Sequence, residues 1–161
     1  MSKEKLTIQK MFRDVPEHKL QEIFDTGNTF NVSSGYVLIE EGQLPRHIYF
    51  VISGEVEVIV PDPESEKDKQ LTTLGAGECV GEYGFIDGRP ASATVRAVET
   101  SQVFAITIPL FKKLLEQDSE FERVVYRNLL STLVERLRTS NVIIDFLQYQ
   151  QQEITKSDGL H

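Results

Sequence analysis

The residues best suited to chemistry lie in one glycine-rich stretch, residues 77–97. Gly81 would let the backbone come close to a ligand, and a helix starting just after it would direct free backbone amides at an anion. Glu82 would accept a hydrogen bond there or, alternatively, serve only as a helix-capping acid. Ser92 is either a second ligand contact or a simple turn serine. The stretch therefore predicts a small anion-binding loop.

The other reactive side chains form no catalytic pattern. His18, His47 and His161 are scattered along the chain, and Cys79 has no evident base beside it. The spacing of His and Cys matches no metal site or nucleophile–base pair. We therefore expect a binding protein rather than an enzyme, with no catalytic residue, no metal and no resident cofactor.

Two ordered motifs resemble those of one family. Residues 77–97 read Gly-Glu-Cys-Val-Gly-Glu-Tyr-Gly-Phe-Ile-Asp-Gly-Arg-Pro-Ala-Ser-Ala-Thr-Val-Arg-Ala. They are similar to the phosphate-binding cassette of cyclic-nucleotide-binding domains, where Gly-Glu, a short helix and Pro-Arg-x-Ala-Thr-Val follow one another. Residues 39–42 and 49–58 resemble the Glu-Gly and Tyr-x-Val-x-x-Gly-x-Val strands of that family. Two such motifs at the family's distance are a specific signal.

The resemblance covers about residues 15–141 and implies a sensor that binds a cyclic mononucleotide, cyclic AMP or cyclic GMP. It places Glu82 against the ribose 2′-hydroxyl and Ser92 against the phosphate. In the catabolite activator branch of the family, polar residues midway along a helix touch the purine, and Ser140 lies at a comparable place or only sets helix register. The predicted ligand-binding set is Val80, Gly81, Glu82, Tyr83, Gly84, Arg89, Pro90, Ala91, Ser92, Ala93, Thr94, Ser140 and Asn141.

One position departs from the family pattern. Where the cassette has an arginine directly after its proline, this chain has Ala91. That arginine pairs with the cyclic phosphate, and a charged hydrogen bond contributes about 1.5–3 kcal/mol, so its loss would weaken binding on the order of ten to a few hundred fold. Two roles are open for Arg89: it replaces the missing arginine at the phosphate, or it is a solvent-exposed loop residue. Arg96 is better suited to a surface or ion-pair role.

Short β-rich runs separated by glycines fill the middle of the chain. They cover residues 36–39, 48–52, 55–60, 70–74, 94–98 and 102–106, with a charged, proline-containing loop at residues 61–69. Many short strands with turn signals between them favour a jelly roll or barrel over a parallel sheet. Before them, Asp14, Pro16 and Glu17 have the form of an N-cap, an early proline and a capping-box acid, so a helix is predicted to start near Val15.

After Pro109 the sequence becomes strongly helical, with Asp118 or Ser119 suited to cap a long final helix. Apolar residues at alternating steps of four and three predict a coiled-coil seam along it. A second apolar face, which includes Val124, Val125 and Leu129, is typical of a helix that contacts both its own core and a partner. We predict a parallel homodimer rather than a helix packed only on its own domain. The predicted interface is Leu130, Leu133, Leu137, Ser140, Ile144 and Leu147.

The predicted fold class is therefore α+β, an antiparallel β-roll of the jelly-roll type flanked by N-terminal helices and a long C-terminal dimerisation helix. The boundaries are residues 1–25 for the N-terminal helices, 26–108 for the cyclic-nucleotide-binding-like β-roll, 109–150 for the C-terminal helices and 151–161 for a tail. A chain of 161 residues suffices for one such unit.

Composition narrows the partners. A net charge of −8 repels nucleic acid, and no apolar run is long enough to span a membrane. A single cysteine, Cys79, fits a reducing compartment, so we expect a cytoplasmic protein. Residues 150–161 are too few for the helix-turn-helix domain that follows the long helix in the catabolite activator branch, which disfavours a transcription factor unless the chain is a fragment.

Two functions remain open at this point. The first is a regulatory sensor that binds cyclic AMP or cyclic GMP and signals through its dimer helix to an effector protein. The second is a degenerate domain that binds no cyclic nucleotide and acts as a dimeric protein-interaction adaptor. Ala91 is the strongest argument for the second.

Overall fold

Eight antiparallel strands form two sheets in the computed structural model, which describes residues 8–65 and 67–158. One sheet has the order β1-β8-β3-β6 and the other the order β2-β7-β4-β5. The strands are β1 (Asn28–Val32), β2 (Val37–Ile39), β3 (His47–Ser53), β4 (Glu55–Pro61), β5 (Asp68–Gly75), β6 (Cys79–Val80), β7 (Thr94–Ala97) and β8 (Ser101–Thr107). All pairings are antiparallel, so the predicted β-roll is confirmed.

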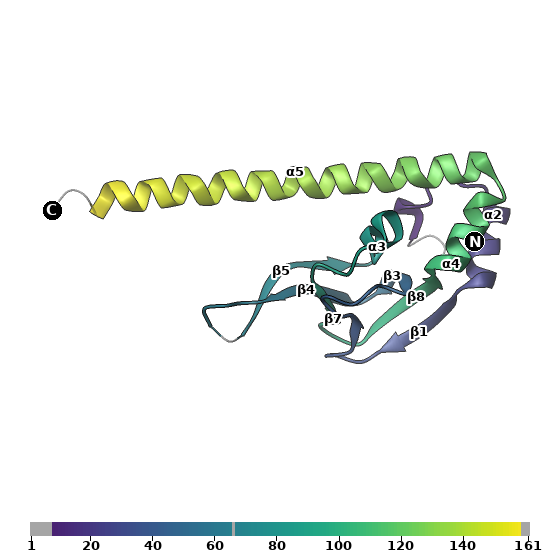
Figure 1. The fold of residues 1–161 in the computed structure, drawn as a ribbon, viewed down its shortest axis with the longest axis horizontal. Helices are drawn as coiled ribbons and strands as arrows, with labels where there is room; N and C mark the ends of the chain where they lie inside the picture. Colours follow the sequence, from purple (N-terminus) through teal and green to yellow (C-terminus); the bar gives the residue numbers. More distant parts are fainter. Residues whose placement is uncertain (1–7, 66, 159–161) are drawn as a thin grey trace.

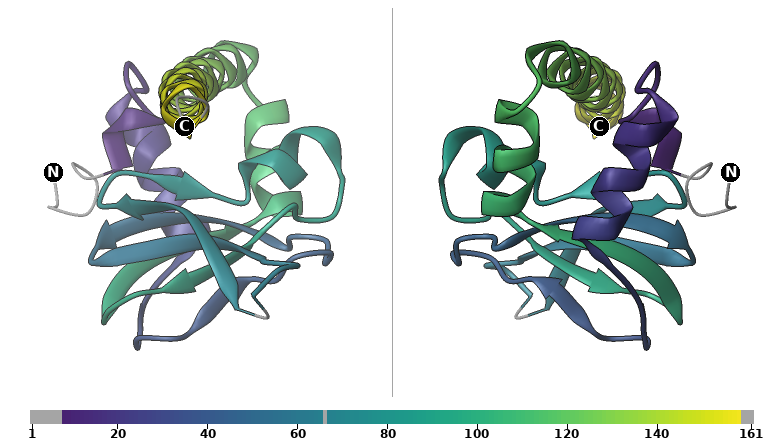
Figure 2. Two further views of the ribbon diagram at one scale, coloured as in Figure 1. Left: turned by 90° about the vertical axis from the view of Figure 1, so that its left-hand side faces the viewer. Right: turned by 90° about the vertical axis from the view of Figure 1, so that its right-hand side faces the viewer.

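The helices lie on one side of the β-roll (Figures 1 and 2). They are η1 (Ile8–Lys10), α2 (Glu17–Thr26), α3 (Glu82–Asp87), α4 (Ile108–Glu116) and α5 (Ser119–Asp158). The α+β fold class with flanking helices and a long C-terminal helix is therefore confirmed. No helix in the described part of the chain combines the length and the apolar character that a membrane span requires.

Side chains alternate along the central strands and so build two cores. Phe50 of β3 and Phe104 of β8 point toward the helices and pack with Phe12 and Phe111 in the larger cluster. Val51, next to Phe50 in the sequence, points the other way, into the interior of the roll. The helical layer is thus held by one face of a sheet whose other face lines the roll.

The second helix begins close to the predicted Val15, but the predicted N-cap was wrong. α2 begins at Glu17, after Pro16, and Asp14 caps nothing. Asp14 instead adopts a left-handed backbone (φ 65°), and its carboxylate forms an ion pair with Arg127 of α5 at 2.8 Å. The side chain that the sequence pattern assigned to capping α2 is therefore used in an ion pair with α5.

The first turns of α5 pack on the core, the helix then passes α3, and its C-terminal part extends beyond the β-roll (Figure 1). Asp118 caps α5, accepting hydrogen bonds from the amides of Glu120 and Phe121, as predicted. Val124, Val125 and Leu129 are buried, whereas Leu130 and Leu137 of the predicted seam are more than 60% exposed. The side chain of Leu147 lies outside the described residues.

Candidate functional site

The cassette turns into α3 at Gly81, where only glycine fits. Its φ of 89° is left-handed, and a Cβ at this position would lie 2.5 Å from the carbonyl oxygen of His47. Both the backbone conformation and the space exclude a side chain. The result is a tight turn that places the next residue, Glu82, on the inner side of α3.

Glu82 is almost fully buried and is ion-paired with a residue from the long helix. Its Oε1 accepts a hydrogen bond from Nη1 of Arg136, although Glu82 itself is only 2% exposed. Nη2 of Arg136 donates to the carbonyl oxygen of Cys79 at 2.8 Å and to Oε2 of Glu78 at 3.2 Å. One guanidinium therefore bridges three groups of the cassette.

The charges of this cluster respond to burial and to one another. Burial raises the pKa of the Glu82 carboxyl, and the Arg136 guanidinium opposes the shift. For Arg136 burial is the largest single influence and acts to lower the pKa, but attraction by Glu82 and Cys79 and the hydrogen bond to Glu78 together outweigh it. The pKa is therefore raised, and the guanidinium stays charged. The pKa of Glu78 is held below its usual range, because its bonds to Lys10 and Arg136 outweigh its partial burial.

The same cluster reaches the N-terminal segment. Nζ of Lys10 lies 2.7 Å from Oε1 of Glu78 and 3.5 Å from Oε2 of Glu135 on α5. Farther along, the buried Asn128 of α5 donates to the carbonyl oxygens of Met11 (3.0 Å) and Arg13 (2.7 Å). α5 is thus tied both to the cassette and to the residues just before α2.

Ala91 lies at the other end of the cassette and carries no charge into it. Its methyl group packs against the apolar cluster inside the β-roll. Its N–H donates to the carbonyl oxygen of Gln43 (2.9 Å), and its carbonyl accepts from the N–H of Gly42 (2.8 Å), which anchors this part of the loop.

The two arginines nearest to Ala91 in the sequence, Arg89 and Arg96, make contacts outside the Glu82 cluster. Arg96 is ion-paired with Glu57 (2.7 Å) and Asp68 (3.3 Å), which confirms the predicted ion-pair role. Arg89 is exposed and forms no ion pair with any residue from 8 to 65 or from 67 to 158; its backbone N–H donates to the Asp87 carboxylate. Neither guanidinium contacts Glu82.

The remaining predicted residues are distributed over both sides of α3. Val80 is buried inside the roll, Gly84 packs against Pro45, and Tyr83 is 52% exposed on the outer face of the helix. The Thr94 hydroxyl accepts a hydrogen bond from the backbone N–H of Glu41. Pro90 and Ser92 are exposed and Ala93 is half-buried.

On α5, Ser140 and Asn141 are exposed, and the Ser140 hydroxyl donates to the carbonyl of Arg136 one turn earlier. The sequence interpretation missed Arg136, the residue of α5 that contacts the cassette. The available signal was a basic residue one helical turn before Ser140, flanking an apolar seam, in a chain whose cassette carries a glutamate.

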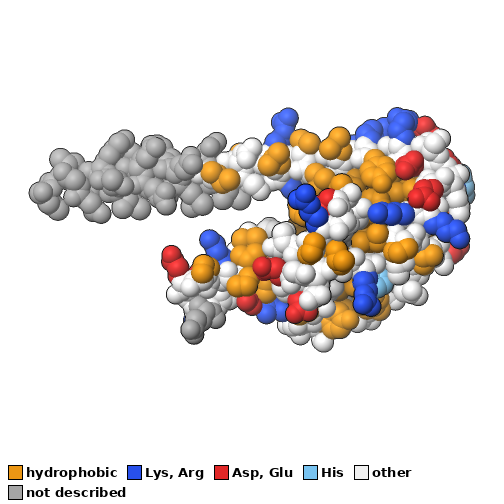
Figure 3. All heavy atoms as spheres, viewed as in Figure 1, with side chains coloured by type: hydrophobic (Ala, Val, Ile, Leu, Met, Phe, Trp, Pro, Cys, Tyr) orange, Lys and Arg blue, Asp and Glu red, His pale blue; other side chains and the backbone are white. Residues whose placement is uncertain are grey.

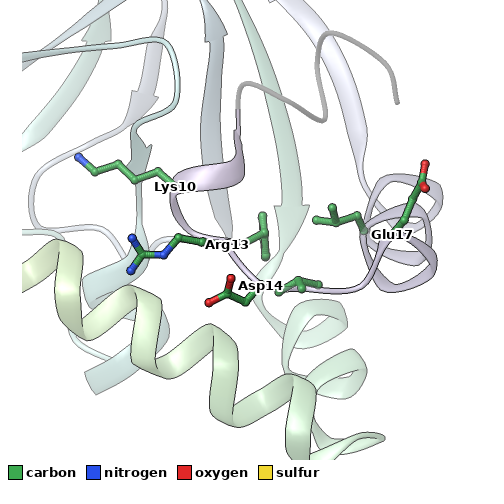
Figure 4. Close-up of a pocket in the computed structure, with 7 residues that line it drawn as sticks. Lys10, Arg13, Asp14 and Glu17 are labelled. Carbon is green, nitrogen blue, oxygen red and sulfur yellow. The ribbon is translucent and has the colours of Figure 1, made fainter.

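A cavity of about 440 Å³ lies beside the N-terminal segment rather than in the cassette (Figure 4). In Figure 4, Lys10, Arg13 and Asp14 extend on the side of α5, whereas Glu17 points away from it. The full lining is Lys10, Phe12, Arg13, Asp14, Val15, Glu17 and Leu20. Within the described residues, no group of three or more His, Cys, Asp or Glu side chains is placed to hold a metal ion.

Comparison with known proteins identifies the domain. The profile of the cyclic nucleotide-binding domain matches residues 29–118. The chain is 32% identical to the rice (Oryza sativa subsp. japonica) potassium channel AKT2 over 98 residues, 61% of this chain and 11% of the channel. It is 30% identical to the cAMP-activated global transcriptional regulator CRP of Salmonella typhimurium over 105 residues, 65% of this chain and 48% of that protein.

Solved structures agree on the fold. A cyclic nucleotide-binding domain from Methylobacillus flagellatus superposes with a TM-score of 0.76 at 23% identity, covering 86% of this chain and 79% of that one. At this identity the likeness concerns the fold alone. The chain spans less than half the length of the two curated relatives named above. The profile match covers more than half of the chain, so this protein belongs to the cyclic nucleotide-binding domain family.

Proposed function

We propose that this domain is a regulatory module that binds a cyclic mononucleotide, cyclic AMP or cyclic GMP, at the cassette and passes the binding event to α5. The observation that carries the proposal is the ion pair between Glu82 and Arg136. A ribose hydroxyl at Glu82 would compete with or join that guanidinium, so a ligand there acts directly on the long helix. Binding would shift a pre-existing equilibrium between two positions of α5.

The family and its cAMP-activated relative support the ligand class, and the buried carboxylate supports a ribose contact. The missing arginine at Ala91 makes the binding weak. Isothermal titration of the purified chain with cyclic AMP, cyclic GMP and 2′-deoxy-cyclic AMP tests this. The deoxy ligand is expected to bind about tenfold or more weakly, because it lacks the 2′-hydroxyl that would donate a hydrogen bond to the Glu82 carboxylate.

Hydrogen exchange along α5 provides the second readout. Saturating ligand is expected to change amide protection around Arg136, while the β4–β5 hairpin stays unchanged. If calorimetry shows binding but amide protection in α5 does not change, the transmission step is rejected. If calorimetry shows no binding heat at millimolar ligand, the binding step is rejected.

The second candidate is an adaptor that binds no cyclic nucleotide. Its specific support is the methyl group of Ala91, which contacts the apolar interior of the roll where the family motif has a cation. Absence of binding together with a stable dimer would favour it.

The proposal includes a homodimer through α5. Leu130, Leu137 and Ile144 are exposed by 63%, 61% and 50%, which leaves an apolar stripe on the side of the helix away from the core. Light scattering after size-exclusion chromatography is expected to give twice the monomer mass. Leu130→Asp with Leu137→Asp is expected to give a monomer, whereas Glu135→Gln, an exposed change on the same helix, is expected to stay dimeric.

A further inference from the structure

The outer face of α3 and the segment beside it expose large apolar side chains. Tyr83 and Ile86 of α3 are 52% and 47% exposed, and Leu44 is 61% exposed. α3 is therefore two-sided: Glu82 and Phe85 point inward, while Tyr83 and Ile86 point to solvent. Single exposed apolar residues are ordinary, but neighbouring ones mark an interaction surface.

Contacts join this face to the start of α4. A Cβ built on Gly84 of α3 would lie 2.8 Å from Cγ of Pro45, so the segment of residues 44–46 packs directly on α3. The N–H of Ile108, the first residue of α4, donates to the carbonyl of Arg46 at 3.0 Å. Nζ of Lys112 in α4 lies 5.7 Å from the ring centre of Phe85. The three segments form one continuous surface.

This surface carries three exposed cations in an acidic protein. Arg46, Arg89 and Lys112 are exposed, and none forms an ion pair with a residue in the described ranges. The acid on the outer side of α3 is Asp87, whose carboxylate accepts the N–H of Arg89. In Figure 3, blue Lys and Arg side chains and red Asp and Glu side chains both lie among orange hydrophobic ones on this face. The whole chain, by contrast, has a net charge of −8.

We propose that this surface docks a protein partner through a short amphipathic segment that carries acidic residues beside apolar ones. We name it the α3 patch: Leu44, Arg46, Tyr83, Ile86, Arg89 and Lys112. The apolar side chains supply the area to bury, and the unpaired cations select a partner of opposite charge. The proposal goes beyond nucleotide binding and holds whether or not the cassette takes a ligand.

An anionic membrane is the less suitable occupant, because a bilayer would face much of a chain whose net charge is −8, whereas a short acidic segment contacts only the three cations and the apolar side chains between them. A second copy of this chain is also less suitable, since the apolar stripe for self-association lies on α5. Both are outcomes that the experiment separates.

A peptide selection tests the α3 patch directly. Short random peptides displayed on phage are selected on the full chain, and the enriched sequences are synthesised with a fluorescent label for anisotropy titrations. The expected winners combine Asp or Glu with Leu, Ile or Phe. Their affinity is expected to fall about tenfold or more for Arg46→Glu with Lys112→Glu, and for Leu44→Ser with Ile86→Ser.

The matched control is Lys69→Glu with Leu71→Ser on the exposed strand β5, where Leu71 is 54% exposed. Circular dichroism confirms that all variants are folded. Winners without acidic residues, or with equal affinity for the patch variants, overturn the proposal. So does flotation of the wild-type chain with phosphatidylserine vesicles that is lost in the patch variants, or a change in oligomeric state on the same substitutions.

Discussion

At the α3 end of the cassette a buried carboxylate, Glu82, meets a guanidinium from α5, whereas at the proline end the position after Pro90 holds the methyl group of Ala91. The first end depends on a residue from another element, because a buried charge is costly unless a partner compensates it. At the second end the backbone N–H and carbonyl of Ala91 are hydrogen-bonded to residues 43 and 42, and no charge needs a partner. The Glu82 end is therefore tied to α5 by an ion pair, which is the link that the proposed function uses, whereas position 91 offers no charge to a phosphate.

The largest expected effect comes from breaking the ion pair at the Glu82 end. Arg136→Ala leaves the Glu82 carboxylate buried without its partner, and we expect unfolding free energy to fall by about 3 kcal/mol. Urea denaturation measures the loss. Arg138→Ala, an exposed arginine on the same helix, serves as control and is expected to change stability by less than about 0.5 kcal/mol.

A double variant sharpens the interpretation. Glu82→Gln combined with Arg136→Met removes both charges and is expected to recover much of the lost stability, since no unpaired charge remains. Equal losses in the single and double variants would contradict a role for the ion pair and point to packing instead.

The opposite end is tested by restoring the missing charge. Ala91→Arg is expected to tighten cyclic nucleotide binding by about 1.5–3 kcal/mol, on the order of ten- to a hundred-fold, because the guanidinium pairs with the phosphate. Calorimetry measures the change, and Ala91→Leu controls for added bulk. Unchanged affinity in Ala91→Arg would show that another cation, such as Arg89, already fills this role.

Another prediction concerns Asn128, which holds α5 to the segment just before α2. Asn128→Ala removes two hydrogen bonds and leaves the carbonyls of Met11 and Arg13 without this donor, so we expect a loss of about 1–2 kcal/mol. Thermal unfolding measures it, with the exposed Ser131→Ala as control. A loss as small as that of the control would mean that residues 11–13 are not held through Asn128.

The smallest effect is the pH dependence of Glu78. Its pKa is lowered in the folded state, so its contribution is present at neutral pH and is lost as pH falls below the usual glutamate range toward the folded value. Because the group is partly exposed, we expect less than about 1 kcal/mol. Glu78→Gln should flatten that part of the stability–pH curve, and an unchanged curve would contradict the assignment.

Local signals predicted much of this molecule. The β-rich run from Ile48 to Ile52 and the glycines between such runs identified the strands of the roll, because strand propensity and turn residues are local properties of the chain. Asp118 was one of the two predicted caps of the long helix, and it could be found locally because its partners are two and three residues away. The motif around Gly81 required glycine, and its φ of 89° explains that requirement.

Residue types and short-range spacing were enough to predict the family, the β-roll and the alanine at position 91 where the family has an arginine. The three-dimensional arrangement was needed to show that Arg136 pairs with Glu82 across 54 positions and that Asp14 pairs with Arg127 instead of capping α2. No local pattern encodes such pairs, because they depend on where α5 crosses the cassette and the N-terminal segment. That path is set by the packing of Val125 and Leu129 on the shared core.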